Sequence, residues 1–236
     1  MKLPPKAFLV LALLLLSGSA AFYFFGRSVW HPVLVKIRGE RSVAEVVGEL
    51  RIQTNIDFEA ENWKRLFLIG LKEERTLEVW GVDQTGVANK LRDFPFTGFS
   101  GSLGPKLKEG DGQIPEGIYR IESLNPNSSY HLSMKLDYPN DFDRRMGKAD
   151  GRDQLGSNIF IHGKSATIGC IPIGDEAIEE LFFMVAEIGV GNVDVILAPY
   201  DSRYNSKTLE IPKIAWEEVL YSQINNKIRE MMPPNH

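Results

Sequence analysis

Apolar residues recur at helical spacing near both ends of the chain. Over residues 40–51, valine and leucine stand at positions i, i+3, i+4 and i+7, which predicts an amphipathic helix that packs on the main domain. Residues 175–188 show the same period and begin with two acids, which suit the first turn of a helix. In the tail, apolar residues recur every four positions from Trp216 to Ile228, which predicts a docking helix.

Between these helices the apolar period changes to that of β-strands. Residues 65–71 and 75–80 are short apolar or alternating runs on either side of a charged turn, as in a β-hairpin. Alternation over residues 130–137 puts His131 on the polar face, where we expect it to be solvated. Three further strands are predicted at residues 118–121, 158–162 and 193–198.

These patterns divide the chain into four parts. Strands outnumber helices in the main domain, so we expect a fold that is mainly β with flanking helices (α+β). The four parts are a signal peptide or signal anchor (1–30), a linker with an amphipathic helix (31–62), the main domain (63–200) and a helical tail (201–236).

The first part carries an export signal. Residues 7–26 are uncharged and strongly apolar, and Lys2 and Lys6 precede them. Twenty apolar residues span a hydrocarbon core of roughly 30 Å, and the basic flank places the bulk of the chain outside the cytoplasm. Small residues allow cleavage after Ala20 or Ala21, but the apolar run continues beyond them, so we favour an uncleaved anchor. The expected location is the periplasm or cell envelope, with membrane attachment through residues 7–26 if the segment is retained.

Composition narrows the chemistry of the exported part. Lysine and arginine total 27 against 31 acids, a net charge of −4, which argues against nucleic acid as the main partner. The one cysteine, Cys170, excludes an internal disulfide and any zinc site built on paired cysteines. No cysteine lies near the apolar run, so a lipoprotein anchor is excluded too. A lone thiol in an exported protein therefore needs a reason.

Two polar loops resemble ligand-binding motifs without matching them. Residues 101–117 hold five glycines and two prolines but no GxGxxG, so they do not predict a phosphate site. Their Lys106 and Lys108 could meet a substrate carboxylate, although charges in such loops are usually solvated. Residues 141–156 begin like a calcium loop, but Met146 stands where an EF-hand needs glycine.

The chemistry concentrates between His162 and Cys170. A predicted strand delivers His162, and Cys170 follows eight positions later, so the imidazole can serve as the base that activates the thiol. Gly163 lacks a Cβ, which lets a backbone carbonyl approach Nδ1 and fix the tautomer. Gly169 allows a sharp turn that presents amide N–H groups to an oxyanion. The alternative is a small buried cysteine beside a structural histidine; a metal site lacks further ligands nearby.

The stretch His-Gly-Lys-Ser-Ala-Thr-Ile-Gly-Cys (162–170) resembles the active-site signature of the L,D-transpeptidase (YkuD-type) catalytic domain family. It is most similar to the short-motif, YafK-like branch of that family. Residues 100–119 and 138–144 resemble two upstream motifs of the same branch, and the similarity covers about residues 63–200. The resemblance implies an L,D-transpeptidase-like β-sandwich catalytic domain, with no cofactor and no metal.

The resemblance also implies roles for individual residues. Cys170 would be the nucleophile, His162 the general base and Gly163 the residue whose carbonyl orients the imidazole. Gly169 and Cys170 would supply the oxyanion amides, and Thr167 occupies the family's Ser/Thr position, which we assign to substrate binding.

Two further residues belong to the expected site, and one position departs from the family pattern. Tyr138 and Arg144 are candidate substrate contacts, each with the alternative of a packed or solvated loop residue. Ile168 stands where the larger family has a second histidine, which departs from the pattern.

The implied substrate is the peptidoglycan stem peptide. Cys170 would form a thioester at the bond between an L-centre of meso-diaminopimelate and the following D-residue, and an amine would then take the acyl group. The alternatives are an L,D-endopeptidase that cuts peptidoglycan cross-links or lipoprotein–peptidoglycan bonds, and a non-catalytic protein that binds peptidoglycan.

Overall fold

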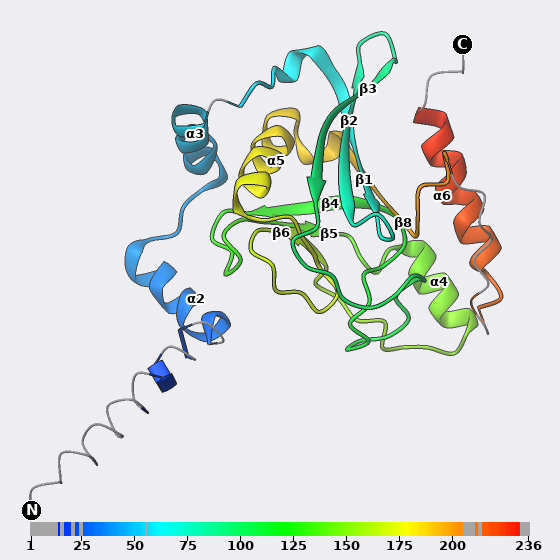
Figure 1. Cartoon of the computed structure of the whole chain (residues 1–236), viewed down its shortest axis with the longest axis horizontal. Helices are drawn as coiled ribbons and strands as arrows, with labels where there is room; N and C mark the ends of the chain where they lie inside the picture. Colours follow the sequence, from blue (N-terminus) through cyan, green and yellow to red (C-terminus); the bar gives the residue numbers. More distant parts are fainter. Residues whose placement is uncertain are drawn as a thin grey trace, which may run out of the picture. The chain divides into compact units, whose positions relative to one another are not determined.

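The structure is a computed structural model of the whole chain, and Figure 1 shows its elements. It describes residues 14, 17–19, 22–23, 26–54, 56–204, 211 and 214–231. The chain forms two compact units, one ending at Arg41 and the other beginning at Ser42.

The first unit contains helix α2 (Arg27–Arg38), which ends at Gly39. Val29, Val33 and Ile37 project from it into solvent. Most of the apolar run 7–26 lies outside the described residues, so its predicted role as an anchor stays a prediction. Among the residues that are described, no helix is both long enough and apolar enough to cross a membrane.

The second unit is built on one mixed sheet of eight strands. Neighbours are antiparallel except for two parallel pairs, β1 with β8 and β6 with β7. The strands in sheet order are β3 (Ala88–Pro95), β2 (Thr76–Asp83), β1 (Trp63–Leu71), β8 (Val193–Ala198), β4 (Gly117–Asn125), β5 (Ser133–Leu136), β6 (Phe160–His162) and β7 (Ile171–Pro172).

The sheet changes direction at β4. The first half of β4 pairs with β8 and its second half pairs with β5, and the register shifts between Ile121 and Ser123. Figure 1 shows the consequence, because β1, β2 and β3 run steeply whereas β4 and β5 run across them. The expected mainly β fold with flanking helices is confirmed, and its sandwich-like form is one curled sheet rather than two separate sheets.

Helices cover both faces of the central strands. Strand β1 alternates between two cores: Leu66 and Leu68 face the larger core with α5, while Phe67 and Ile69 face a second core with α6. Burial on both faces explains why the sequence of β1 is a continuous apolar run. The helices of this unit are α3 (Val43–Gln53), α4 (Asp141–Ala149), α5 (Asp175–Ile188) and α6 (Glu217–Met231), with short 3₁₀ turns η1 (Ala60–Asn62) and η2 (Val190–Asn192).

Most predicted elements are confirmed, including the hairpin β1–β2, the helices α3, α5 and α6, and strand β8. Two differ. The strand predicted over residues 130–137 shortens to β5, and His131 was wrongly expected to be solvated, because its Nε2 lies 2.6 Å from Oε1 of Glu179 on α5. Helix α4 was missed. It begins at a capping box formed by Asn140 and Asp143, so the polar residues that resembled the start of a calcium loop initiate a helix.

Candidate active site

The parallel pair β6–β7 brings His162 and Cys170 to one face of the sheet. Ile161 pairs with Ile171 and points into the core, so the residues one position away face the opposite side. His162 is the last residue of β6, and Cys170 immediately precedes β7. The parallel register therefore places the imidazole and the thiol on the same face of neighbouring strands, with Cys170 two positions before the residue that pairs with His162.

Gly163 fixes the orientation of the His162 ring. Its carbonyl oxygen lies 2.5 Å from Nδ1, the contact expected from the sequence. Nδ1–H donates to this carbonyl, which leaves Nε2 as the proton acceptor. Burial lowers the pKa of His162, and the Gly163 contact raises it in part. The ring is therefore uncharged at neutral pH, and its Nε2 can accept a proton.

The turn after His162 is held by side chains that sequence reasoning missed. Asp175, at the start of α5, accepts the backbone N–H of Lys164 at 2.9 Å and pairs with the Lys164 ammonium. A Cβ on Gly163 would lie 2.7 Å from both this carboxylate and the Tyr130 carbonyl oxygen. The Tyr130 ring packs against the His162 ring at an interplanar angle of 41°, with centroids 4.6 Å apart. These contacts leave little freedom to the base.

The turn before Cys170 is organised by the Thr167 hydroxyl. Its Oγ1 accepts the N–H of Gly169 at 3.2 Å and of Cys170 at 2.9 Å, and it donates to the Cys170 carbonyl at 2.7 Å. Gly169 has φ +124°, and a Cβ there would lie 3.0 Å from the Gln113 carbonyl oxygen, so only glycine fits. The two amides expected at an oxyanion site are thus engaged by Thr167 in this structure.

The thiol of Cys170 is partly buried. Its Sγ lies 3.7 Å from the carbonyl oxygen of Asn158, to which it donates. Burial raises the pKa of the Cys170 thiol, while a backbone hydrogen bond at Phe160 and the positive charge of Lys106 lower it in part. A thiolate at this position therefore depends on a base and on nearby positive charge.

Comparison with known proteins agrees with this geometry. The model of the L,D-transpeptidase catalytic domain matches residues 65–196, which is more than half of the chain and includes both His162 and Cys170. The chain belongs to the L,D-transpeptidase catalytic domain family.

Individual relatives of this L,D-transpeptidase family member match part of its chain. YafK of Escherichia coli (strain K12), named as a candidate L,D-transpeptidase, is 30% identical over 156 residues, which are 63% of this chain and 61% of YafK. The chain thus spans about three fifths of the length of the curated relatives it matches.

Solved structures show a more distant likeness. The helical cell shape determining protein Pgp2 of Campylobacter jejuni has TM-score 0.48 and 18% identity, covering 80% of this chain and 78% of Pgp2. The L,D-transpeptidase LdtMt1 in complex with imipenem has TM-score 0.32 and 14% identity, covering 57% and 59%. The family assignment rests on the sequence match alone.

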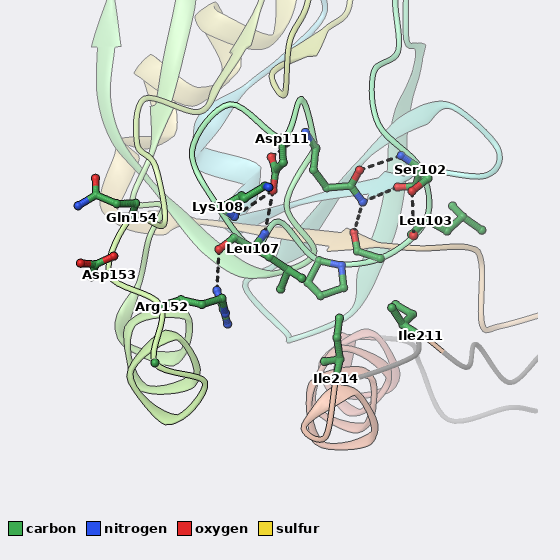
Figure 2. Close-up of a pocket in the computed structure, with 14 residues that line it drawn as sticks. Ser102, Leu103, Leu107, Lys108, Asp111, Arg152, Asp153, Gln154, Ile211 and Ile214 are labelled. Carbon is green, nitrogen blue, oxygen red and sulfur yellow. Dashed lines mark hydrogen bonds between the residues drawn. The ribbon is translucent and has the colours of Figure 1, made fainter.

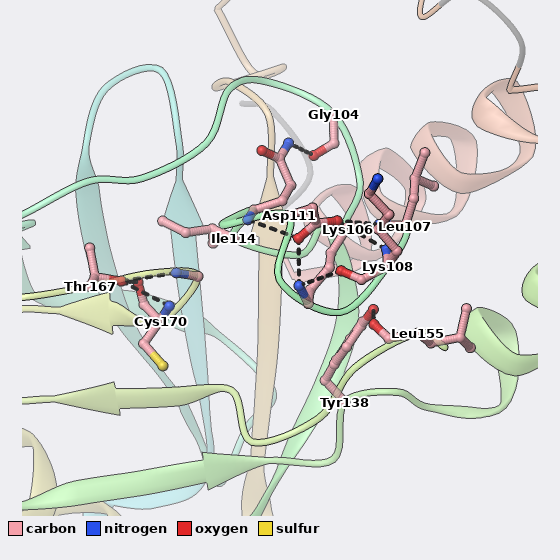
Figure 3. Close-up of polar contacts among 12 residues, drawn as sticks. Gly104, Lys106, Leu107, Lys108, Asp111, Ile114, Tyr138, Leu155, Thr167 and Cys170 are labelled. Carbon is pink, nitrogen blue, oxygen red and sulfur yellow. Dashed lines mark hydrogen bonds and ion pairs between the residues drawn. The ribbon is translucent and has the colours of Figure 1, made fainter. Parts of the chain in front are cut away.

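A glycine-rich loop between β3 and β4 borders the catalytic turn of this L,D-transpeptidase domain (Figure 3). Asp111 accepts the backbone N–H groups of Leu107, Lys108 and Gln113, each at 3.0 Å. Gln113 in turn bonds the backbone of Ser102 and Gly104 through its side-chain amide. The loop is therefore folded by its own polar residues, and its Gln113 carbonyl reaches Gly169.

A buried ion pair anchors the same loop. Lys72 Nζ lies 2.9 Å from Oε1 of Glu116, and neither side chain is exposed. The ammonium also donates to the carbonyls of Gly104 and Ile114, and Glu116 accepts from the Tyr221 hydroxyl of α6 at 2.8 Å. Sequence patterns gave no sign of this network, because its members are far apart along the chain.

The remaining predicted residues differ in their burial. Tyr138 is 4% exposed and its hydroxyl donates to the Leu155 carbonyl at 2.8 Å, so it packs in the core and supports this segment, and its role as a substrate contact stays a prediction. Arg144 is exposed and lines a pocket of about 320 Å³ with Glu109, Asp153 and Gly156, where its substrate role stays a prediction. Ile168, two positions before Cys170, is 88% exposed.

The largest pocket among those described lies on the outer side of the glycine-rich loop (Figure 2). It has a volume of about 660 Å³, with apolar walls that include Leu103, Leu107 and Ile214, and the charged Lys108 and Arg152. Within the described ranges, no group of His, Cys, Asp and Glu side chains is arranged to hold a metal ion.

Proposed function

We propose that this chain catalyses acyl transfer on peptidoglycan stem peptides through Cys170. His162 Nε2 takes the thiol proton, and the thiolate attacks the carbonyl at an L-centre of meso-diaminopimelate. The bond from that carbon to the nitrogen of the following D-residue breaks as the thioester forms, and the leaving amine receives the proton from His162. An acceptor amine then takes the acyl group and frees the thiol.

The observation that carries this proposal is the shared face of His162 and Cys170 on β6–β7, with Nδ1 held by Gly163. A neutral imidazole with a free Nε2 is what a thiol nucleophile requires. Membership of the L,D-transpeptidase family supplies the substrate class. Stabilisation of the oxyanion by the amides of Gly169 and Cys170 requires that they exchange Thr167 Oγ1 for the substrate oxygen.

Hydrolysis is the second candidate, because water in place of the amine completes the same thioester chemistry. The product would then be a cut cross-link or a released lipoprotein rather than a new bond. Ile168 is relevant to the choice between an amine and water as acceptor, because this exposed apolar side chain occupies the position of the family's second histidine.

A peptidoglycan substrate implies that the domain acts in the cell envelope. We propose export to the periplasm, with residues 7–26 as signal or membrane anchor, on the basis of their apolar sequence and basic flank.

The test uses the full chain with a defined tetrapeptide monomer and a cross-linked muropeptide dimer, with products identified by mass spectrometry. The parent should convert at least one of them; Cys170→Ala and His162→Gln should abolish conversion, and the control His31→Gln should retain it. New dimers indicate transpeptidation, and monomers from dimer indicate hydrolysis. Identical product profiles for the parent and Cys170→Ala would refute the proposal. This includes the outcome in which both proteins bind the peptides and neither converts them.

A further inference from the structure

Lys106 is an almost buried cation beside the catalytic turn. Its side chain is 5% exposed, although a lysine in a glycine-rich loop is normally solvated. The ammonium lies 2.5 Å from Oδ1 of Asp111 and 2.9 Å from the carbonyl oxygen of Lys108. An ammonium has three N–H donors, and among the described residues only these two acceptors bind it. One donor of a nearly buried charge is therefore left for a ligand, since an unsatisfied donor there is costly.

Lys106 lies near the segment that contacts the Cys170 thiol. Its Cε is close to Gly156, where an added Cβ would lie 3.2 Å away. Two residues further along the same segment, Asn158 accepts the Cys170 thiol. The positive charge of Lys106 lowers the pKa of Cys170, which places the two groups within electrostatic reach. Figure 3 shows Lys106 between the outer part of the loop and Cys170.

Asp111 leaves Lys106 available to a second anion. The carboxylate of Asp111 is shared, because Oδ1 also accepts the N–H of Gln113 and Oδ2 accepts two backbone N–H groups. Its charge thus stabilises the loop as well as the ammonium. Along residues 153–157 a pocket of about 320 Å³ provides room for a substrate residue on this side of the loop.

We propose that Lys106 binds a carboxylate of the substrate that flanks the scissile bond, and that Asp111 positions it for this contact. The inference rests on the proposed function for the identity of the substrate. Stem peptides offer two such carboxylates, one on the leaving D-residue and one on the D-centre of diaminopimelate. Lys108 is the matched control, because it is exposed and belongs to the same loop.

Binding is measured by calorimetry with full-length Cys170→Ala protein, which cannot turn over the peptide. The probes are the tetrapeptide, its C-terminal D-alanine amide, and the form amidated at the D-centre of diaminopimelate. One amide should bind about tenfold or more weakly than the free acid, as for loss of a charge-assisted hydrogen bond. Adding Lys106→Met should reduce that preference to about twofold or less, whereas Lys108→Met should preserve it and Lys106→Arg should retain part of it.

The amide that loses affinity identifies which carboxylate is bound. A preference that survives Lys106→Met, equal binding of all three peptides, or no measurable binding overturns the proposal. Turnover is measured separately, with protein that retains Cys170. If the peptide is turned over but its binding shows no preference that depends on Lys106, only this inference is refuted. If the preference is present but the peptide is not turned over, only the catalytic function is refuted. Because the ratio of two dissociation constants is taken on one sample, partial unfolding of Lys106→Met does not mimic the result.

A second measurement uses the thiol itself. The rate of Cys170 alkylation by iodoacetamide is followed against pH in protein that retains the cysteine. Lys106→Met should shift the profile to higher pH, and Lys108→Met should not. Coincident profiles for the parent and Lys106→Met would contradict the placement of this charge beside the thiol.

Discussion

The buried pair of Lys72 and Glu116 allows a sharp prediction about stability. In Lys72→Met, the Glu116 carboxylate loses its counterion, while it retains the Gly104 N–H at 2.7 Å and the Tyr221 hydroxyl at 2.8 Å. The carbonyls of Gly104 and Ile114 lose a donor. Removing one member of a buried pair costs about 3–5 kcal/mol, and the two retained hydrogen bonds favour the lower end, about 3 kcal/mol.

Urea unfolding followed by circular dichroism measures this cost. With a slope of about 2 kcal/mol/M, the midpoint of Lys72→Met should fall by about 1.5 M. Adding Glu116→Gln removes the uncompensated charge, so the double variant should be more stable than Lys72→Met by about 1 kcal/mol or more. The control Lys64→Met changes an exposed lysine of β1 and should stay within about 0.5 kcal/mol of the parent. A loss below about 1 kcal/mol in Lys72→Met, or a double variant less stable than it, would refute the reasoning.

Three further predictions concern the turns and the pH dependence. Thr167→Val removes the acceptor of two backbone amides and should cost about 1–2 kcal/mol in urea unfolding, whereas Thr167→Ser should cost less than about 0.5 kcal/mol; equal losses would contradict the role of the hydroxyl. Gly163→Ala forces a Cβ to 2.7 Å from the Tyr130 carbonyl and should cost about 2 kcal/mol, which lowers Tm by about 4–8 °C in a unit of this size; an unchanged Tm in a thermal scan would count against this packing. Burial raises the pKa of Asp143 to about 6, above its unfolded value of about 3.9, so its contribution to stability is complete below pH 4 and is lost as pH rises through 6. This loss is at most about 3 kcal/mol, and Asp143→Asn should not show it when urea midpoints are measured against pH. Parallel pH profiles of the parent and Asp143→Asn would exclude Asp143 as its source.

The elements that sequence patterns predicted are those whose burial follows one simple period. Helix α5 buries one broad apolar stripe, and β8 is buried on both faces, so their limits were predicted correctly. Strand β3 was missed because it is a sheet edge in which polar and apolar residues do not alternate, and α4 because it buries little beyond Gly147. Their positions are set by the pairing of β3 with β2 and by the cap at Asn140, which hydrophobic periodicity does not detect.

The candidate site was predictable where it is local in sequence. His162, Gly163 and Cys170 lie within nine residues, and their residue types carry the chemistry. The solvation expected for Lys106 was wrong, because Asp111 and the folded loop bury the ammonium. Lys72 follows β1 and Glu116 precedes β4, at the same end of the sheet with β8 between them, and such long-range pairing leaves no periodic signal.

The place of β8 in the sheet has a consequence for how the chain folds. β8 is the last strand along the sequence, yet it lies between β1 and β4 and joins the two halves of the sheet. Until residues 193–198 are available, β1 and β4 each present an unpaired strand edge. A nascent chain that stops before β8 therefore contains His162 and Cys170 but no continuous sheet to support them. Folding of this domain waits for nearly its whole length, which favours slow, cooperative assembly and makes C-terminal truncations prone to aggregation.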